Sequence, residues 1–256
     1  MDMRLTWRRH RWSGALLAAV LTATACDGDA VRDMPRGREY PLHTNIVATT
    51  FWVGEVVDPT ASDGSQVVSA YDSDWMDHYG GCDGIQRGDV CTTEPRTAEN
   101  GFFPTHMVPK ENPFYLDLPF DDLNDPIAFA QRNRVVPWAD DPGYAGHGTD
   151  RSFSYLKNRW VEISNDSTTC YGQIQDAGPG EYHDAEYVFG NQDARPANRK
   201  FNGAGMDVSP ALNGCLGFQQ LNGNHDVVDW RFVDAQDVPP GPWKRIVTTR
   251  PPVRDW

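Results

Sequence analysis

Short apolar runs separated by turn residues are the dominant pattern along this chain beyond its first 25 residues. The runs are rich in β-branched and aromatic residues, and Gly, Pro, Asn and Asp separate them throughout, a pattern typical of short strands. Seven segments are predicted to be strands: Ile46–Val53, Gln66–Ala70, Phe114–Leu118, Trp160–Ser164, Cys170–Gln175, Val227–Val233 and Arg245–Thr249. The chain is therefore predicted to be mainly β, and the roughly 210 residues from Asn45 onward fit one all-β domain.

Two places combine a helix-capping residue with a proline. Asp125-Pro126 predicts a helix over Ile127–Arg132, since aspartate is a good N-cap and proline suits the first helical position. Ser209-Pro210 predicts a second helix over Ala211–Leu216, which Gly217 ends. The long stretches 72–113 and 177–204 are expected to be loops that are functional or held by disulfides.

The N-terminus has a different pattern, with four arginines before a run of small and apolar residues. The arginines stand at positions 4, 8, 9 and 11, and the run of about a dozen residues extends from Gly14 to Ala25, which is shorter than the roughly 20 residues of a membrane-spanning helix. We predict a cleaved signal peptide at 1–25. A buried N-terminal helix is the alternative, but the run lacks the polar positions of a second helix face.

The residues that follow the apolar run indicate how the mature chain starts. Thr24-Ala25-Cys26 resembles the end of a bacterial lipobox, although Ala23 stands where leucine is preferred. We expect Cys26 to be lipidated, residues 26–44 to form a tether, 45–250 to form the domain and 251–256 to be a C-terminal tail. The protein is then expected in the cell envelope, anchored to a bacterial membrane by lipid alone, and plain secretion is the alternative.

Charge narrows the range of partners. The whole chain has a net charge of −13, and loss of residues 1–25, which hold four arginines and Asp2, leaves 19 basic and 35 acidic side chains, a net charge of −16. An acidic surface repels polyphosphate, so nucleic acid is not an expected partner. We expect a monomer without a cofactor.

The cysteines support an oxidising compartment. Four remain after lipidation of Cys26, and four cysteines allow three disulfide connectivities. We predict the pairs Cys82–Cys91 and Cys170–Cys215, because the first pair closes a natural local loop. No CxxC or Cys/His spacing suggests zinc.

Three motifs occur in order along the domain: Ala48-Thr49-Thr50-Phe51-Trp52, then Asp176-Ala177-Gly178-Pro179, then Asp207-Val208-Ser209-Pro210, before the strand that ends at Val233. Their order resembles the double-psi β-barrel proteins of the rare lipoprotein A, expansin and family-45 endoglucanase type. The resemblance covers about half of the mature chain. It implies a six-stranded double-psi β-barrel with long loops and short helices, and a polysaccharide groove across the barrel.

The resemblance also implies an aspartate as general acid, and its motifs point to Asp176 and Asp207. Cleavage of a glycosidic bond requires a carboxylic acid that protonates the leaving oxygen, and inverting hydrolysis requires a second carboxylate. In the family-45 enzymes that second group follows the aromatic pair of the first strand, where this chain has Val53 and Gly54, with Glu55 nearest. A one-acid lytic transglycosylase needs only the first group.

Each aspartate also has a structural interpretation. Asp176 would close an Asx turn, and Asp207 would bind backbone amides near the helix start at Ser209. We predict that Asp207 is held ionised by those amides and by the helix dipole. Asp176, which has fewer such partners in this interpretation, is then the expected acid.

Two further groups are candidate substrate contacts, because aromatic faces stack on sugar rings and polar side chains bind hydroxyls. The first lies in the segment 71–79, where a surface loop held by Trp75 beside Cys82 is the alternative; the second alternates along one face of the strand at 170–175. The candidates are Tyr71, Asp72, Asp74, Trp75, Tyr171, Gln173 and Gln175. A calcium site at Asp72, Asp74 and Asp77 would lack the glycine and terminal glutamate of an EF-hand, so no metal is predicted.

The sequence therefore leads to two functional hypotheses. The first is an exported lipoprotein that binds cell-wall polysaccharide (peptidoglycan) and cleaves it by a one-acid, lytic-transglycosylase-like mechanism. The alternative is a non-catalytic, expansin-like polysaccharide-binding protein or envelope scaffold.

Overall fold

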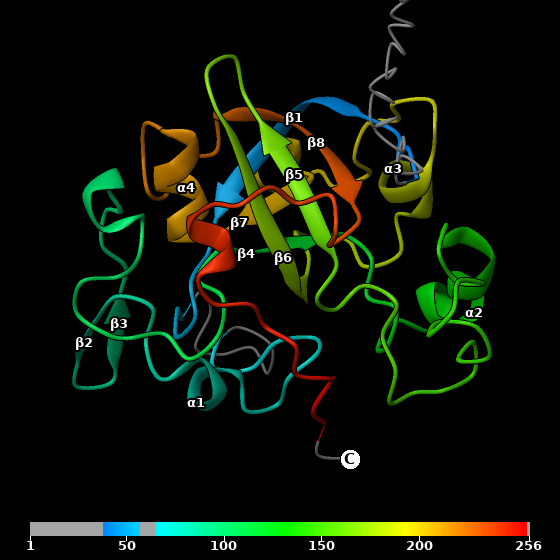
Figure 1. Cartoon of the computed structure of the whole chain (residues 1–256), viewed down its shortest axis with the longest axis horizontal. Helices are drawn as coiled ribbons and strands as arrows, with labels where there is room; N and C mark the ends of the chain where they lie inside the picture. The colour runs from blue at the N-terminus through cyan, green and yellow to red at the C-terminus, as the bar shows by residue number, and fades with distance from the viewer. Residues whose placement is uncertain (1–37, 57–64, 255–256) are drawn as a thin grey trace, which may run out of the picture. The chain divides into compact units, whose positions relative to one another are not determined.

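Six strands close into a barrel in the computed structural model, which describes residues 38–56 and 65–254 (Figure 1). The predicted signal peptide and Cys26 lie outside the described residues. The strands are β1 (His43–Thr50), β2 (Ile85–Arg87), β3 (Val90–Thr92), β4 (Tyr115–Leu118), β5 (Trp160–Ser164), β6 (Thr169–Ala177), β7 (Met206–Val208) and β8 (Val227–Val233). The helices are α1 (Trp75–Tyr79), α2 (Pro126–Val135), α3 (Ala185–Phe189) and α4 (Pro210–Leu216), with 3-10 turns η1 (Ala98–Asn100), η2 (Phe201–Gly203) and η3 (Pro242–Lys244).

The barrel has mixed strand pairing, in the order β1-β7-β4-β6-β5-β8. The pairs β1/β7 and β4/β6 are parallel, and the remaining neighbours are antiparallel. The hairpin of β2 and β3 forms a separate two-stranded sheet. The prediction of a mainly β chain with a closed six-stranded barrel and few short helices is confirmed.

The pairing pattern repeats between the two halves of the barrel. In chain order, the first three barrel strands are β1, β4 and β5, and the last three are β6, β7 and β8. When β1 is exchanged with β6, β4 with β7 and β5 with β8, the pairings β4/β7 and β5/β8 map onto themselves, and every other pairing maps onto another observed pairing. An approximate two-fold axis in the topology therefore passes between β4 and β7, which pair with each other.

The barrel interior is filled by apolar side chains that alternate along these strands. Leu116, Ile174, Met206 and Val208 are completely buried in one core cluster. Gly172 lies where a side chain would meet Leu116 and Leu212 at 2.8 Å. On β6 the predicted alternation holds, since Ile174 enters this core while the glutamines on either side form hydrogen bonds with outer segments.

Two predicted strands are not strands, and three strands were not predicted: β7 in the barrel, and β2 and β3 in the stretch 72–113 that was expected to be a loop. Residues 66–70 and 245–249 lack ladder pairing, and β7, only three residues long, supplies the sixth strand. The segment 245–249 is apolar for another reason: it packs along β6, where Thr248 N donates to Gln173 Oε1 at 2.9 Å. Strand β6 also extends beyond the predicted end, to Ala177.

The boundaries of the domain are wider than predicted at both ends. His43 stacks on Trp230 with ring centroids 4.2 Å apart, and Tyr40 is also buried, so the last residues of the predicted tether belong to the barrel. At the other end, Val253 N donates to Tyr71 O at 2.9 Å. Val253, which lies in the segment predicted as a C-terminal tail, is therefore hydrogen-bonded to the domain.

The helix and disulfide predictions are confirmed. Asp125 caps α2 by accepting from Ile127 N and Ala128 N, and Ser209 caps α4, which ends at Gly217 in the left-handed conformation. The two bridges are Cys82–Cys91 and Cys170–Cys215, with Cα atoms 5.7 and 6.4 Å apart. Two disulfides are consistent with an exported or extracellular protein.

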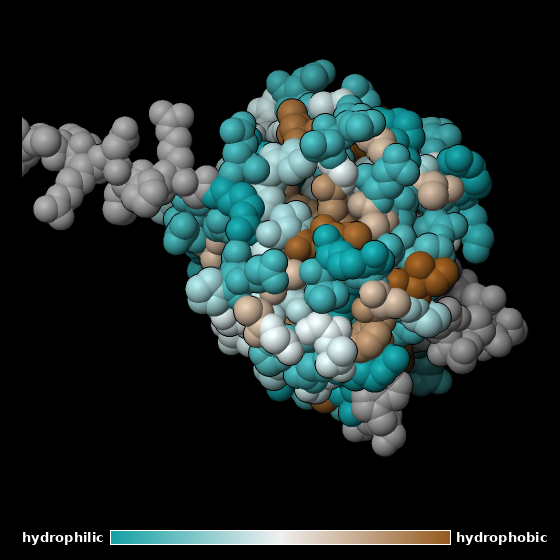
Figure 2. Space-filling model, turned by 90° about the vertical axis from the view of Figure 1, so that its right-hand side faces the viewer, coloured by the Kyte–Doolittle hydropathy of each residue, from teal (hydrophilic) through white to brown (hydrophobic). Residues whose placement is uncertain are grey.

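None of the helices in residues 38–56 and 65–254 is long and apolar enough to cross a membrane. Figure 2 shows that the face bearing α2 and α3 is mainly hydrophilic, with hydrophobic groups in small, separate patches.

Candidate active site

Four neighbouring strands place four polar side chains in one row, which we call the acidic row. Thr49 on β1 pairs with Asp207 on β7, Asp207 pairs with Asp117 on β4, and Asp117 pairs with Asp176 on β6. Paired positions on adjacent strands project their side chains to the same side of a sheet. The row therefore brings together the two aspartates predicted from the sequence motifs and adds a third, Asp117, between them.

A β-bulge brings Asp176 into this row. The pairing of β4 with β6 changes register between Leu116, opposite Ile174, and Asp117, opposite Asp176, so that Gln175 is the extra residue. A bulge of this kind shifts the side-chain alternation by one position. Without it, Asp176 would project to the same side as Ile174, into the core.

Hydrogen bonds hold the three carboxyl groups in different ways. Asp117 Oδ1 accepts from Asp207 N at 3.0 Å, and the Asp207 carboxyl is bonded by the Thr49 hydroxyl. Asp176 Oδ1 accepts from two backbone amides, Ala70 N at 2.7 Å and Ala177 N at 2.8 Å. Gly178 completes the close packing, because a side chain there would meet Asp117 Oδ2 at 2.9 Å.

Burial raises the pKa of every carboxyl group in the row. It raises the pKa of Asp176 to about 7, and burial followed by the charges of Glu55 and Asp176 raises the pKa of Asp207 to about 7. The pKa of Asp117 lies well above its ordinary value, because burial and the two neighbouring aspartates disfavour a third negative charge. Carboxyl groups with pKa values near neutral pH are suited to proton donation.

The structure reverses the predicted difference between Asp176 and Asp207. Asp207 lies on β7, and it is Ser209 Oγ that accepts from the α4 amide of Leu212 at 3.2 Å. Helix amides therefore do not hold Asp207 ionised, whereas Asp176 receives two amide bonds. Asp176 is only 7% exposed and Asp117 only 4%, while Asp207 is partly exposed. Asp207 is therefore the most solvent-accessible carboxyl group of the row.

Glu55 is a fourth carboxyl group near the row. Its charge contributes to the raised pKa of Asp207, and burial raises its own pKa to about 7. The preceding positions cannot supply this group: Val53 is completely buried beside Trp75, and a side chain on Gly54 would meet Cys91 Sγ at 2.9 Å. Glu55 is therefore the nearest carboxyl group after the first-strand motif, and its charge acts on Asp207.

The predicted sugar-stacking residues of the segment 71–79 are enclosed by protein. Tyr71 and Trp75 are completely buried. The Trp75 ring packs against Phe51 and Tyr115, and Tyr71 Oη donates to Phe120 O at 3.3 Å. These rings support the barrel and are not available for stacking on a ligand.

The three candidates on β6 are bonded to other parts of the chain. Gln173 accepts from Asn112 Nδ2 and Thr248 N, both at 2.9 Å. Gln175 Oε1 accepts from Lys157 Nζ at 3.0 Å, and Tyr171 Oη donates to a glutamate of β5 at 2.8 Å. These side chains fasten the outer segments to the barrel.

Asp72 and Asp74 form a group with His78. His78 Nδ1 lies 2.9 Å from both Asp72 carboxyl oxygens, and Asp74 N donates to Asp72 Oδ1 at 3.0 Å. In the part of the chain that the structure describes, these three residues are the set whose ligand atoms come close enough to hold a metal ion, all within 4.8 Å. Asp77 does not belong to this set, and the aspartates of the acidic row do not converge in this way.

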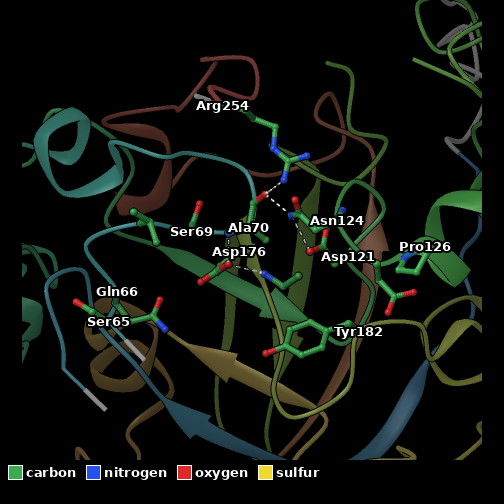
Figure 3. Close-up of a pocket in the computed structure, with 13 residues that line it drawn as sticks. Ser65, Gln66, Ser69, Ala70, Asp121, Asn124, Pro126, Asp176, Tyr182 and Arg254 are labelled. Carbon is green, nitrogen blue, oxygen red and sulfur yellow. Dashed lines mark hydrogen bonds between the residues drawn. The ribbon is translucent and has the colours of Figure 1, made fainter. Parts of the chain in front are cut away.

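A pocket of about 490 Å³ opens beside Asp176 (Figure 3). It is lined by Ser65, Gln66, Val68, Ser69, Ala70, Asp121, Asn124, Asp125, Pro126, Asp176, Ala177, Tyr182 and Arg254. Sequence reasoning did not assign a site role to most of these residues, since they come from loops far apart in the chain. For Asp117 a signal was present: it is a single carboxylate inside the apolar run from Phe114 to Phe120.

The fold and the site together define a class of protein, a six-stranded β-barrel with a row of carboxyl groups of raised pKa beside a pocket. Comparison of the chain with family models, with curated proteins and with solved structures finds no match.

Proposed function

We propose that this domain binds a polysaccharide across the acidic row and cleaves a glycosidic bond, with Asp207 as the proton donor. The acidic row is the observation that carries the proposal: a partly exposed carboxyl group whose pKa is about 7 lies between a hydroxyl and two buried carboxyl groups. The order of the motifs, which resembles that of the double-psi barrel proteins acting on polysaccharides, supports a glycan as substrate.

The proposed reaction needs one acid. Protonated Asp207 gives its proton to the glycosidic oxygen while the bond from that oxygen to the anomeric carbon breaks. A hydroxyl group of the same sugar forms the new bond to the anomeric carbon, and its proton returns to the Asp207 carboxylate. No water is consumed, so the new chain end is an anhydro sugar and the carboxyl group is regenerated.

Neighbouring residues prepare Asp207 for this role. Burial and the charges of Glu55 and Asp176 make a negative charge at Asp207 unfavourable, and Asp117 fixes the β7 backbone through the bond from Asp207 N. The Thr49 hydroxyl orients the Asp207 carboxyl from the opposite strand. Glu55 supports a second reaction course, in which a carboxylate near Asp207 activates water and the product is an ordinary reducing end.

The test compares wild type with Asp207→Asn on purified peptidoglycan, with mass analysis of the soluble products. Wild type is expected to release products lighter by one water than hydrolysis products, whereas Asp207→Asn loses cleavage by at least about a hundredfold and melts at a temperature no lower than wild type. Asp229→Asn is the matched control, since Asp229 is a partly exposed barrel aspartate outside the row. Products that have the mass expected of hydrolysis would instead indicate that Glu55 activates a water molecule.

Two results would contradict the proposal. Normal cleavage by Asp207→Asn would exclude it as the acid, and Asp176→Asn would then be the variant to compare. Binding of peptidoglycan by wild type without any soluble product would favour the non-catalytic, expansin-like function instead.

The location of the protein is part of the proposal: an exported, monomeric lipoprotein held to a bacterial membrane through Cys26. The predicted signal peptide and the two disulfides support this location. Cys26→Ala is expected to move the protein from the membrane fraction to the soluble fraction, as checked by cell fractionation and immunoblotting. Unchanged membrane association of Cys26→Ala would argue against the lipid anchor.

A further inference from the structure

We infer that the pocket beside Asp176 is a binding subsite for one sugar ring that donates hydrogen bonds and carries no negative charge. The inference rests on the proposed function, because the ring would belong to the same polysaccharide. It adds the chemical character of the substrate, which the acidic row alone does not define.

The pocket is continuous with the acidic row through two of its lining residues. Asp176 belongs to both. Gln66 on the pocket side is bonded to the segment of Glu55, since Gln66 N donates to Glu55 O at 2.8 Å and Gly54 N donates to Gln66 O at 3.0 Å. A polymer that reaches Asp207 and Glu55 therefore extends naturally into this pocket.

The charged side chains of the pocket are bonded to the protein or lie beside an opposite charge. Asp121 Oδ1 accepts from Leu123 N at 3.0 Å and from Asn124 N at 2.9 Å, and the charge of Arg254 acts on Asp121. Asp125 caps α2 and lies 3.3 Å from His183 Nδ1. Three carboxyl groups and one guanidinium line the pocket, so its charge disfavours an anionic ligand.

The polar atoms directed into the pocket include an acceptor that needs a donor. Gln66 Oε1 is buried and has no hydrogen-bond partner among the described residues. A buried acceptor left unpaired costs roughly 1–3 kcal/mol, so a ligand hydroxyl or amide N–H at this position would gain that free energy. Ser65 and Ser69 add hydroxyl groups to the same wall.

An exposed aromatic ring lies across from these groups. Tyr182 is 42% exposed and lines the pocket, and Figure 3 shows Asp176 between Tyr182 and Gln66. Val68 and Pro126 extend the apolar surface of the pocket. A sugar ring has an apolar C–H face and a rim of hydroxyl groups, which matches an aromatic face opposite polar acceptors. The volume of about 490 Å³ lies within the usual range of small-molecule sites.

The experiment measures binding of three oligosaccharides of equal length to the purified full chain by NMR titration and calorimetry. The probes are chitotetraose, which is uncharged and N-acetylated, its de-N-acetylated cationic form, and anionic tetragalacturonate. We expect tetragalacturonate to bind at least about tenfold more weakly than chitotetraose, because carboxyl groups outnumber the guanidinium in the pocket. Equal or tighter binding of tetragalacturonate would overturn the inference, and so would binding of the cationic form alone, which would mean that charge and not the sugar ring is recognised.

Variants locate the binding. Tyr182→Ala and Gln66→Leu are each expected to weaken chitotetraose binding about tenfold, whereas Tyr182→Phe keeps the ring and binds like wild type. Phe201→Ala is the matched control, since Phe201 is 50% exposed and does not line the pocket. Undiminished binding by both Tyr182→Ala and Gln66→Leu would place the sugar elsewhere.

The results distinguish failure of the subsite from failure of the proposed catalytic function. Wild type that binds chitotetraose in this pocket but cleaves no glycan would leave the subsite standing and remove the acid role of Asp207. Cleavage of glycan with no effect of the pocket variants on binding would do the reverse.

Discussion

Asp117 and Asp207 face each other on the two central strands of the row, and yet only Asp207 reaches solvent. The exchange of the two barrel halves maps each of these residues onto the other. Asp117 is covered by the Gly178 turn, whereas Asp207 lies beside Thr49 and Glu55. The difference between a buried carboxyl group and an accessible one arises from the loops around the barrel.

The raised pKa values in the row predict that the domain is less stable at alkaline pH. A carboxyl group with a raised folded-state pKa binds more protons in the folded than in the unfolded chain, between its ordinary pKa near 4 and its folded value. Asp176 and Asp207 have folded values of about 7. The free energy of unfolding therefore falls as pH rises from about 4 to 7, by up to roughly 1.4 kcal/mol per pH unit for each buried carboxyl group.

Thermal unfolding by circular dichroism at pH 5 and pH 8 checks this dependence. Wild type is expected to melt at a lower temperature at pH 8. Asp117→Asn keeps an acceptor for Asp207 N but removes one buried acid, so the difference between the two pH values should shrink. Burial opposes the charge of Glu94, but hydrogen bonds from Thr105 and His106 outweigh it and lower the pKa of Glu94 to about 2. The stability that Glu94 contributes to the fold is therefore lost only as the pH falls below about 4. A melting temperature that rises from pH 5 to pH 8 would contradict the prediction.

At the scale of elements, the C-terminal segment holds one wall of the site. Ser73 N donates to Val253 O and Val253 N donates to Tyr71 O, both at 2.9 Å. Directly before Tyr71 lies Ala70, whose amide binds Asp176. The last described residues thus fix a backbone donor of the acidic row, although they are far from it in the chain.

Deletion of residues 253–256 is expected to raise the pKa of Asp176 above about 7, because the amide of Ala70 stabilises the carboxylate form. Carboxyl ¹³C NMR titration measures this pKa independently of any activity. Deletion of 255–256 alone, which keeps Val253 and Arg254, is the matched control and should leave the pKa unchanged. An unchanged pKa of Asp176 in the longer deletion would show that the segment does not position the Ala70 amide.

The elements that the sequence predicts well are those with a strong local pattern. Trp160–Ser164 and Val227–Val233 coincide with β5 and β8, since apolar residues alternate along them. Both helix caps are local signals of two residues. Strand β7 has three residues, too few for periodicity, and the bulge at Gln175 depends on pairing with β4. The two aspartates were therefore found from motifs, but their partner Asp117 and the pocket required the fold.

On the scale of the whole molecule, the two disulfides close loops of different length. Cys170–Cys215 spans 45 residues and joins β6 to α4, whereas Cys82–Cys91 spans nine residues around the β2–β3 hairpin. In the chain-entropy model, the longer loop stabilises the fold by about 4 kcal/mol and the shorter by about 2.5 kcal/mol. The longer bridge also lies at the barrel core, since Cys170 is completely buried.

Alanine replacement of both Cys170 and Cys215 is therefore expected to lower the melting temperature by roughly 10 °C. Replacement of both Cys82 and Cys91 is the matched comparison and should have a smaller effect. The measurement is reversible thermal or urea unfolding under oxidising conditions. A larger loss from the Cys82–Cys91 variant would mean that the hairpin contributes more than its loop length implies.

The repeated strand pairing has a consequence for the direction in which a polymer crosses the barrel. The central strands look alike from both ends of the row, so their backbone does not distinguish one orientation of a bound chain from the other. The two ends differ in that β1 contributes the Thr49 hydroxyl and β6 contributes Asp176 with the Tyr182 pocket beyond it. Under the proposed function, these few side chains would set the polarity of the substrate, and hence which side of the cut bond becomes the new chain end. A transplant of the pocket loops to the opposite end of the row would then reverse the direction of cutting without changing the barrel.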